Sequence, residues 1–181
     1  MPERLNFKGV AALLVDRNTY YRSLIAQMLR GFGLHTINSC ESGEEAKKII
    51  GEFPVDFCLM EANLPDMSGA SLIRWIRQEQ REPIRFVPIL VFSGYTQLRL
   101  LSVTRDAGAN LLLKKPVSAQ AIYDRIGWIG RTPRAYIETD LYVGPDRRFQ
   151  DKSPPGGVYR RHDDIRTCVT DPASEQQTSG S

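Results

Sequence analysis

Short apolar runs alternate with longer amphipathic stretches along the first 130 residues of the chain. Five of these runs have the length and the apolar content of a buried strand. They span residues 10–15, 36–39, 57–60, 89–92 and 111–113. Regular alternation of strands with helix-length stretches is typical of an α/β domain built around a parallel sheet.

The stretches that follow these strands place apolar residues at helical spacing. They span residues 20–32, 43–51, 71–79, 97–107 and 118–129. In the first stretch, Ile25, Met28 and Leu29 fall on one face, and Ser42 and Ser118 stand where the second and last helices need N-caps. The pattern therefore predicts a doubly wound (βα)5 domain with a parallel sheet, whose functional site lies at the carboxyl ends of the strands.

The composition of the chain changes after Gly130. Gly, Pro, Ser and Asp are frequent there, and neither a helical nor an alternating period is present. We expect residues 1–130 to form one domain, residues 131–170 to form an irregular arginine-rich extension, and residues 171–181 to form a disordered tail. Because the predicted core residues all precede Gly130, truncation at that point should leave a folded domain.

Charge is distributed unevenly along the chain. The formal net charge is +3, and all of it belongs to the part up to Gly130, since positive and negative residues balance after it. Proteins bind long nucleic acids mainly by neutralising phosphates with an excess of positive charge. Because the extension has no such excess, we do not expect it to bind a long nucleic acid. No apolar run reaches the roughly 18 residues of a membrane span, and residues 1–8 lack the apolar core of a secretion signal. We therefore expect a cytoplasmic protein without membrane insertion.

Polar residues stand where the predicted strands end. Asp16 and Arg17 follow the first strand, Glu61 follows the third, Ser93 follows the fourth, and Lys115 comes shortly after the fifth. The carboxyl ends of parallel strands meet at one edge of a sheet. These side chains are therefore expected to converge.

Together with Asn63-Leu-Pro-Asp-Met-Ser-Gly69 and the pair Lys115-Pro116, these residues resemble the receiver domains of response regulators, the CheY-like family. The resemblance covers about residues 10–129. It implies that two adjacent acids after the first strand hold Mg²⁺ and that an aspartate after the third strand accepts a phosphoryl group. It also implies that a Ser or Thr and a Lys contact that group, and that the output is a contact with a signalling protein.

The sequence departs from this family at two positions. Arg17 stands where the second metal-binding acid is expected, and Glu61 stands at the acceptor position, whereas Asp16, Ser93 and Lys115 match. A guanidinium in place of a carboxylate removes a hard oxygen ligand, so we expect neither a metal nor another cofactor at this site. Glu61 is long enough to pair with Lys115 or Arg17, which predicts a permanently satisfied, non-catalytic site.

Two interpretations of this cluster stay open. It is either an ion-pair cluster that only holds the strand ends together, or a fixed active-like state that a partner recognises.

The extension combines aromatic residues, paired arginines and acids in two short stretches. The residues concerned are Tyr142, Arg147, Arg148, Asp151, Tyr159, Arg160, Arg161, Asp163 and Asp164. Arginine donates bidentately to guanine and binds phosphate, acids accept from guanine N–H groups, and aromatic rings stack on bases. These residues therefore carry the chemistry needed to bind a guanine nucleotide.

The extension resembles the arginine-rich extensions of CheY-like effectors that bind cyclic di-GMP. Its repeated Arg-x-x-Asp spacing is similar to the inhibitory-site motif of diguanylate cyclases. This resemblance covers about residues 142–164 and implies cyclic di-GMP as the ligand. Two other interpretations stay open, namely a solvated charged tail with local ion pairs, and a segment that docks on its own receiver domain or on a partner.

The sequence therefore predicts a non-enzymatic, phosphorylation-independent signalling adaptor of the bacterial two-component type. In the first hypothesis, the extension binds cyclic di-GMP and thereby changes the contacts of the receiver domain with its partner. In the alternative, there is no ligand, and Glu61 acts as a fixed phosphomimetic in a constitutive adaptor. An ordinary phosphoryl-accepting regulator is disfavoured, because phosphoryl transfer in this family needs the metal.

Overall fold

The structure of the chain is a computed structural model. It describes residues 5–79, 82–94, 98–131, 135–139, 142–146 and 167–169.

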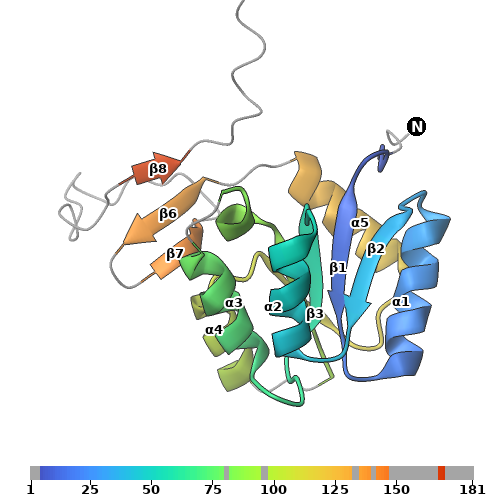
Figure 1. Cartoon of the computed structure of the whole chain (residues 1–181), viewed down its shortest axis with the longest axis horizontal. Helices are drawn as coiled ribbons and strands as arrows, with labels where there is room; N and C mark the ends of the chain where they lie inside the picture. Colours follow the sequence, from blue (N-terminus) through green and yellow to red (C-terminus); the bar gives the residue numbers. More distant parts are fainter. Residues whose placement is uncertain are drawn as a thin grey trace, which may run out of the picture.

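A five-stranded parallel sheet forms the centre of the molecule (Figure 1). Its strands are β1 (Ala11–Val15), β2 (Thr36–Cys40), β3 (Phe57–Glu61), β4 (Ile89–Ser93) and β5 (Leu111–Lys114). They lie in the order β2-β1-β3-β4-β5, and every neighbouring pair is parallel. The predicted doubly wound (βα)5 sheet is thereby confirmed, with each predicted strand shifted by one residue at one end.

Five helices connect and follow these strands. They are α1 (Thr19–Gly31), α2 (Gly43–Glu52), α3 (Gly69–Gln78), α4 (Leu98–Asp106) and α5 (Ala119–Arg131), with a short 3-10 helix, η1 (Ile84–Phe86), before β4. The helix α3 begins at Gly69 rather than at the predicted residue 71, because the Ser68 hydroxyl caps it by accepting from the Ser71 amide.

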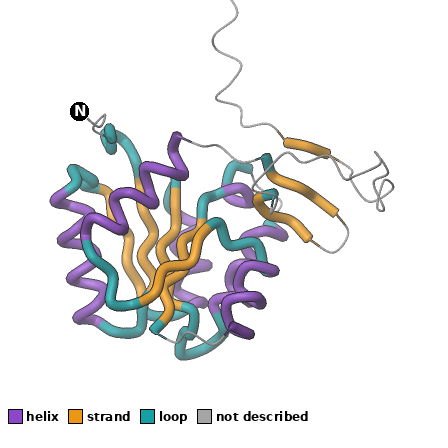
Figure 2. The backbone as a smooth tube through the Cα atoms, turned by 180° about the vertical axis from the view of Figure 1, so that it is seen from behind, coloured by secondary structure: helices purple, strands orange, loops and turns teal. Residues whose placement is uncertain are grey.

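The two faces of the sheet bury two separate apolar layers. Figures 1 and 2 show the sheet from opposite sides, with helices on both of its faces. Leu13 and Val15 of β1 pack in the layer that contains residues of α2 and α3. Ala12 and Leu14 pack in the layer that contains residues of α1 and α5. This alternation follows from the two-residue period of a strand, and it explains why these strands read as continuous apolar runs.

The loop between β3 and α3 is fixed to the start of α2. The Asp66 carboxylate accepts from the backbone amides of Gly43 and Glu44, each at 2.9 Å. These backbone hydrogen bonds hold the pKa of Asp66 below its usual range. The contact holds the loop that follows Glu61 in one position.

The C-terminal extension is not irregular throughout, which corrects the expectation from its composition. The strands β6 (Tyr136–Thr139) and β7 (Tyr142–Pro145) form an antiparallel hairpin, and β8 (Thr167–Val169) pairs with the other edge of β6. Strands of three or four residues are too short to show an alternating pattern in the sequence. These three strands are therefore evident from the structure and not from the sequence pattern.

The hairpin packs beside α3 rather than on the last helix (Figures 1 and 2). Its Tyr136 ring lies over the guanidinium of Arg77, a residue of α3 that is completely buried. In the described part of the chain, no helix combines the length and the apolar composition needed to cross a bilayer.

Candidate functional site

The carboxyl ends of the central strands bring four polar residues together. Asp16 follows β1, Glu61 ends β3, Ser93 ends β4, and Lys115 follows β5. The parallel register places the ends of neighbouring strands side by side, with Glu61 opposite Phe92 in β4. The structure therefore brings Asp16, Glu61 and Lys115 together at this edge, but not the Arg17 side chain.

Lys115 is the centre of this cluster. Its ammonium group donates to Asp16 Oδ2 at 2.6 Å and also to Glu61 Oε2. The Tyr21 ring lies over the ammonium, with 4.3 Å between Nζ and the ring centroid. The side chains of Lys115, Asp16 and Glu61 expose only 12%, 2% and 13% of their surface, so these charges balance one another largely away from water.

The electrostatics of the cluster favour a charged lysine. Burial lowers the pKa of Lys115, but the hydrogen bonds and charges of Asp16 and Glu61 outweigh burial, and the pKa is raised above its ordinary value. The second oxygen of Asp16 accepts from the Asn18 amide at 2.8 Å. Both oxygens of this carboxylate are therefore occupied by donors of the chain itself.

Arg17 does not join the cluster. Its side chain is exposed and forms no hydrogen bond or ion pair with any other described residue. Of the two partners expected for Glu61, the structure therefore selects Lys115. Ser93 is buried, and its carbonyl accepts from the Lys115 amide at 2.9 Å, which anchors the start of the loop between β5 and α5. The following peptide bond, Lys115-Pro116, is cis.

The donor set at this edge does not fit the Mg²⁺ that the receiver fold implies. Mg²⁺ needs several hard oxygen ligands in near-octahedral geometry. Here Asp16 and Glu61 both accept from the Lys115 ammonium, and Arg17 stands where a second metal-binding acid after β1 is expected, so that carboxylate is missing. Across the residues that the structure describes, no group of three or more His, Cys, Asp or Glu side chains could hold a metal ion.

Of the predicted nucleotide-binding residues, the structure describes Tyr142. Its hydroxyl donates to the Pro145 carbonyl at 2.9 Å, and its amide donates to Thr139 Oγ1 at 3.0 Å, so the side chain folds against its own hairpin. The others lie outside the described residues: Arg147, Arg148, Asp151, Tyr159, Arg160, Arg161, Asp163 and Asp164.

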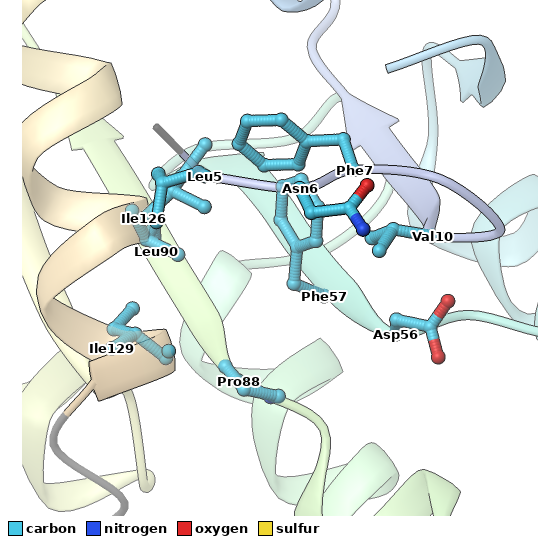
Figure 3. Close-up of a pocket in the computed structure, with 11 residues that line it drawn as sticks. Leu5, Asn6, Phe7, Val10, Asp56, Phe57, Pro88, Leu90, Ile126 and Ile129 are labelled. Carbon is cyan, nitrogen blue, oxygen red and sulfur yellow. The ribbon is translucent and has the colours of Figure 1, made fainter. Parts of the chain in front are cut away.

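A cavity of about 210 Å³ lies at the opposite end of the sheet, where the strands begin (Figure 3). Phe57, Leu90 and Ile126 contribute apolar walls, and the Asp56 carboxylate lies beside them. Asp56 Oδ2 already accepts from the Ala11 amide at 2.7 Å. The cavity has no cluster of titratable groups comparable to the one around Lys115, and we do not assign the site to it.

Sequence reasoning missed three residues that connect the extension to the sheet. Arg77 is fully buried in α3, Asn110 precedes β5, and Tyr136 begins β6. One signal was available, because Arg77 follows Ile73 by four residues and therefore falls on the buried face of the helix. The contributions of Asn110 and Tyr136 depend on tertiary contacts that the sequence does not display.

The parallel sheet and the lysine-centred cluster at its carboxyl edge define a receiver-type signalling domain. The chain belongs to the response regulator receiver domain family, whose profile matches residues 12–127. It is accordingly a receiver-domain signalling protein of the two-component type.

Two curated relatives illustrate how far the sequence similarity extends. The chemotaxis protein CheY of Pseudomonas aeruginosa is 26% identical over 114 residues, which are 63% of this chain and 90% of that protein. The response regulator protein PilR of the same species is 28% identical over 144 residues, which are 80% of this chain but 31% of PilR. The match to CheY thus covers most of that protein, whereas the match to PilR covers less than a third of it.

Solved structures agree on the fold. The chemotaxis response regulator CheY4 of Vibrio cholerae superposes with a TM-score of 0.61 at 21% identity, covering 66% of this chain and 98% of that one. A response regulator from Chloroflexus aurantiacus gives a TM-score of 0.60 at 28% identity, covering 68% of this chain and 99% of that one.

Proposed function

We propose that this protein is a cytoplasmic, non-enzymatic signalling adaptor whose receiver domain works without phosphorylation and whose extension binds cyclic di-GMP. In this proposal, residues 1–130 carry the receiver, residues 131–170 carry the ligand-binding extension, and residues 171–181 are a disordered tail. Binding of the ligand changes the contacts that the receiver makes with a signalling protein.

The observation that carries the proposal is the engagement of Lys115 by two carboxylates of the chain, Asp16 and Glu61. In receivers a lysine at this position contacts the phosphoryl group. Glu61 is one methylene longer than aspartate, and its carboxylate already reaches the lysine that the phosphoryl oxygen would contact. This arrangement supports a receiver that needs no phosphoryl group to reach its signalling state.

Treatment with acetyl phosphate and Mg²⁺, followed by intact-mass spectrometry, tests the first half of the proposal. The wild-type protein should gain no phosphate, because Arg17 replaces a metal ligand and Glu61 replaces the acceptor. Glu61→Asp alone should also stay unmodified, since the metal defect remains. The double variant Arg17→Asp/Glu61→Asp is the matched positive control and should gain one phosphate. A stoichiometric adduct on wild-type protein would show that phosphorylation independence is wrong.

Binding of cyclic di-GMP is supported by the chemistry of the extension. The first arginine pair, Arg147-Arg148, begins directly after Asp146, whose amide donates to the Ala135 carbonyl at 2.8 Å in the docked hairpin. The extension balances its arginines with acids, which suits a compact dianion with two guanine edges better than a long polyanion. A ligand bound next to the hairpin would have a route to the receiver domain.

Calorimetric titration of the full chain with cyclic di-GMP, with GTP and a DNA oligonucleotide as controls, tests the second half. A bidentate guanine contact is worth about 1–3 kcal/mol, so Arg148→Ala and Arg161→Ala should each weaken binding about tenfold or more. Arg148→Lys keeps the charge but loses the planar fork, and should bind more weakly than wild type. Absence of binding at about 50 μM, roughly −6 kcal/mol, would rule the ligand out.

The second candidate is a constitutive adaptor without a ligand, in which Glu61 acts as a fixed phosphomimetic. The direct bond between Glu61 and Lys115 favours it as well. Hydrogen exchange of the full chain separates the two candidates. A ligand-responsive adaptor should gain protection when cyclic di-GMP is added, whereas a constitutive adaptor should change only when Glu61→Ala removes the fixed carboxylate.

A further inference from the structure

Arg77 in α3 is a buried cation with neutral neighbours. All five N–H donors of its guanidinium are used, and none of the acceptors is a carboxylate. The acceptors are the carbonyls of Gly108, Arg85 and Val87 and the side-chain oxygen of Asn110, at 2.8 to 3.1 Å. Burial lowers the pKa of Arg77, but a guanidinium stays charged at neutral pH. This positive charge is therefore held without a negative partner in the described part of the chain.

The C-terminal hairpin closes the remaining side of Arg77. The Tyr136 ring lies over the guanidinium at 5.3 Å, and its hydroxyl accepts from the Asn110 side-chain amide at 3.2 Å. Beside it, Phe86 meets Tyr136 edge to face, with ring centroids 5.3 Å apart. One aromatic ring of the extension thus covers a cation and an aromatic side chain of the receiver domain.

A salt bridge forms the rim of this contact. Arg85 Nη2 lies 2.7 Å from Glu138 Oε1, and the side chains are 15% and 39% exposed. Glu138 follows Tyr136 by two residues in β6, so both side chains lie on one face of the strand. The receiver surface beneath the hairpin therefore recognises an aromatic residue followed two positions later by an acid. We call this the α3–η1 surface, and its residues are Arg77, Arg85, Phe86, Gly108 and Asn110.

The hairpin does not satisfy this surface completely. The Nε–H group of Arg85 is buried and has no hydrogen-bond partner in the described chain. Glu138 reaches only Nη2 of the same guanidinium. A carboxylate placed along the Nε edge would accept from both donors, which is the stronger bidentate geometry. An occupant with such an acid would make one hydrogen bond more than the hairpin does.

The hairpin is attached in a way that permits release. Its strands pair with each other and with β8, and none of them pairs with the five-stranded sheet. The backbones meet closely at Gly108 and Gly144, where a methyl group on Gly108 would lie 2.7 Å from the Val143 carbonyl. Undocking would therefore break side-chain contacts and this close approach, and would leave the strand pairing of both sheets intact.

We propose that the α3–η1 surface is a protein-interaction surface that the hairpin blocks within the same chain. Its partner is a different protein that presents an extended segment with an aromatic residue and, two positions later, a carboxylate. The unpaired charge of Arg77 and the orphan donor of Arg85 provide the charge complementarity for that acid. This inference is independent of phosphorylation and of cyclic di-GMP binding.

Fluorescence anisotropy with a labelled peptide of residues 135–146 tests whether the surface can be filled from outside. The full-length variant Tyr136→Ala/Glu138→Ala should release the surface and bind the peptide at least tenfold more tightly than wild-type protein does. A peptide with Gln at the position of Glu138 should bind the variant about tenfold more weakly. Adding Arg85→Ala to the variant should abolish binding. Equal peptide binding by wild type and variant would overturn the proposed block.

Control variants separate the surface from general effects. Tyr20→Ala/Glu52→Ala removes an exposed aromatic residue and an exposed acid of α1 and α2, and should bind no more peptide than wild type. If the double variant at β6 fails to fold by circular dichroism, Glu138→Ala alone provides the test, because it deletes only the rim salt bridge. Wild-type dimers in sedimentation that dissociate on Arg85→Ala would show that the hairpin of a second copy, and not another protein, fills the surface.

Discussion

Lys115 illustrates how single residues determine the state of the site. The difference between aspartate and glutamate at position 61 is one methylene group, and it brings a carboxylate to the ammonium without any ligand. Asp16 contributes the second carboxylate at 2.6 Å. The site is therefore balanced internally, while Arg17, which the sequence placed in the same cluster, stays in solvent.

Replacement of Lys115 by methionine should destabilise the protein in a pH-dependent way. Two nearly buried carboxylates would lose their shared cation, which costs about 3 kcal/mol or more at pH 7. Because the folded-state pKa of Lys115 is raised, its contribution is complete below about pH 10.4, the value in unfolded chains, and is lost as the pH rises through the folded-state pKa.

Urea unfolding of wild type and Lys115→Met at pH 8, 9.5 and 11 measures this. The difference in the free energy of unfolding should shrink at the highest pH. A difference that stays constant up to pH 11 would mean that the ion pairs do not stabilise the fold.

At the scale of elements, the start of α2 depends on a residue from another loop. Asp66 accepts from two amides of the first turn of α2, and hydrogen bonds to these amides lower its pKa. We expect Asp66→Ala to lower the melting temperature at pH 7, and Asp66→Asn to lower it less, because the amide oxygen still accepts.

The pH dependence of this effect has a defined sign. The pKa of Asp66 is depressed, so its stabilisation is present above about pH 3.9 and is lost as the pH falls through the folded-state value. Melting curves of wild type and Asp66→Ala should therefore converge below pH 3. Parallel curves down to pH 2 would contradict the proposed role of the carboxylate.

The contact between the hairpin and the receiver depends on a glycine in the turn before β5. Gly108 has a φ of +105°, and a methyl group there would collide with the Val143 carbonyl. Gly108→Ala should lower the free energy of unfolding by about 1–3 kcal/mol and weaken hairpin docking.

Gly51→Ala in α2 is the matched control for this substitution. Nothing lies within 4 Å of its added methyl group, so it should stabilise the protein by up to about 1 kcal/mol. Chemical denaturation gives the stabilities, and hydrogen exchange of β6 reports docking. If both variants have the same stability, the close approach of the two backbones is not important.

For the whole molecule, we expect the docked C-terminal hairpin to stabilise the receiver domain. Truncation after Arg131 removes Tyr136 and exposes the guanidinium of Arg77, whereas truncation after Asp146 retains the docked hairpin. We expect the shorter protein to be about 2 kcal/mol less stable than the longer one, because an aromatic contact and a partly buried salt bridge are lost. Equal stability in urea would show that the hairpin adds nothing to the receiver fold.

Local patterns were sufficient to predict the fold. The apolar runs at β1, β3 and β4 are buried on both faces of the sheet, and such strands stand out in any sequence. The convergence of Asp16, Glu61 and Lys115 followed from the same reasoning, because parallel strands align their carboxyl ends. The helix α3 was placed too late, since its cap, Ser68, lies outside the amphipathic pattern.

The sequence by itself thus determined the parallel sheet, the helices that cover it and the edge where the charged residues meet. Each of these depends on a periodicity carried by neighbouring residues. Only the tertiary structure decided that Glu61 pairs with Lys115 and not with Arg17, and that the extension forms a hairpin over Arg77. These choices depend on distances between segments far apart in the chain. A short strand carries no period that would predict it, and the helical spacing that places Arg77 on the buried face of α3 does not indicate which segment covers it.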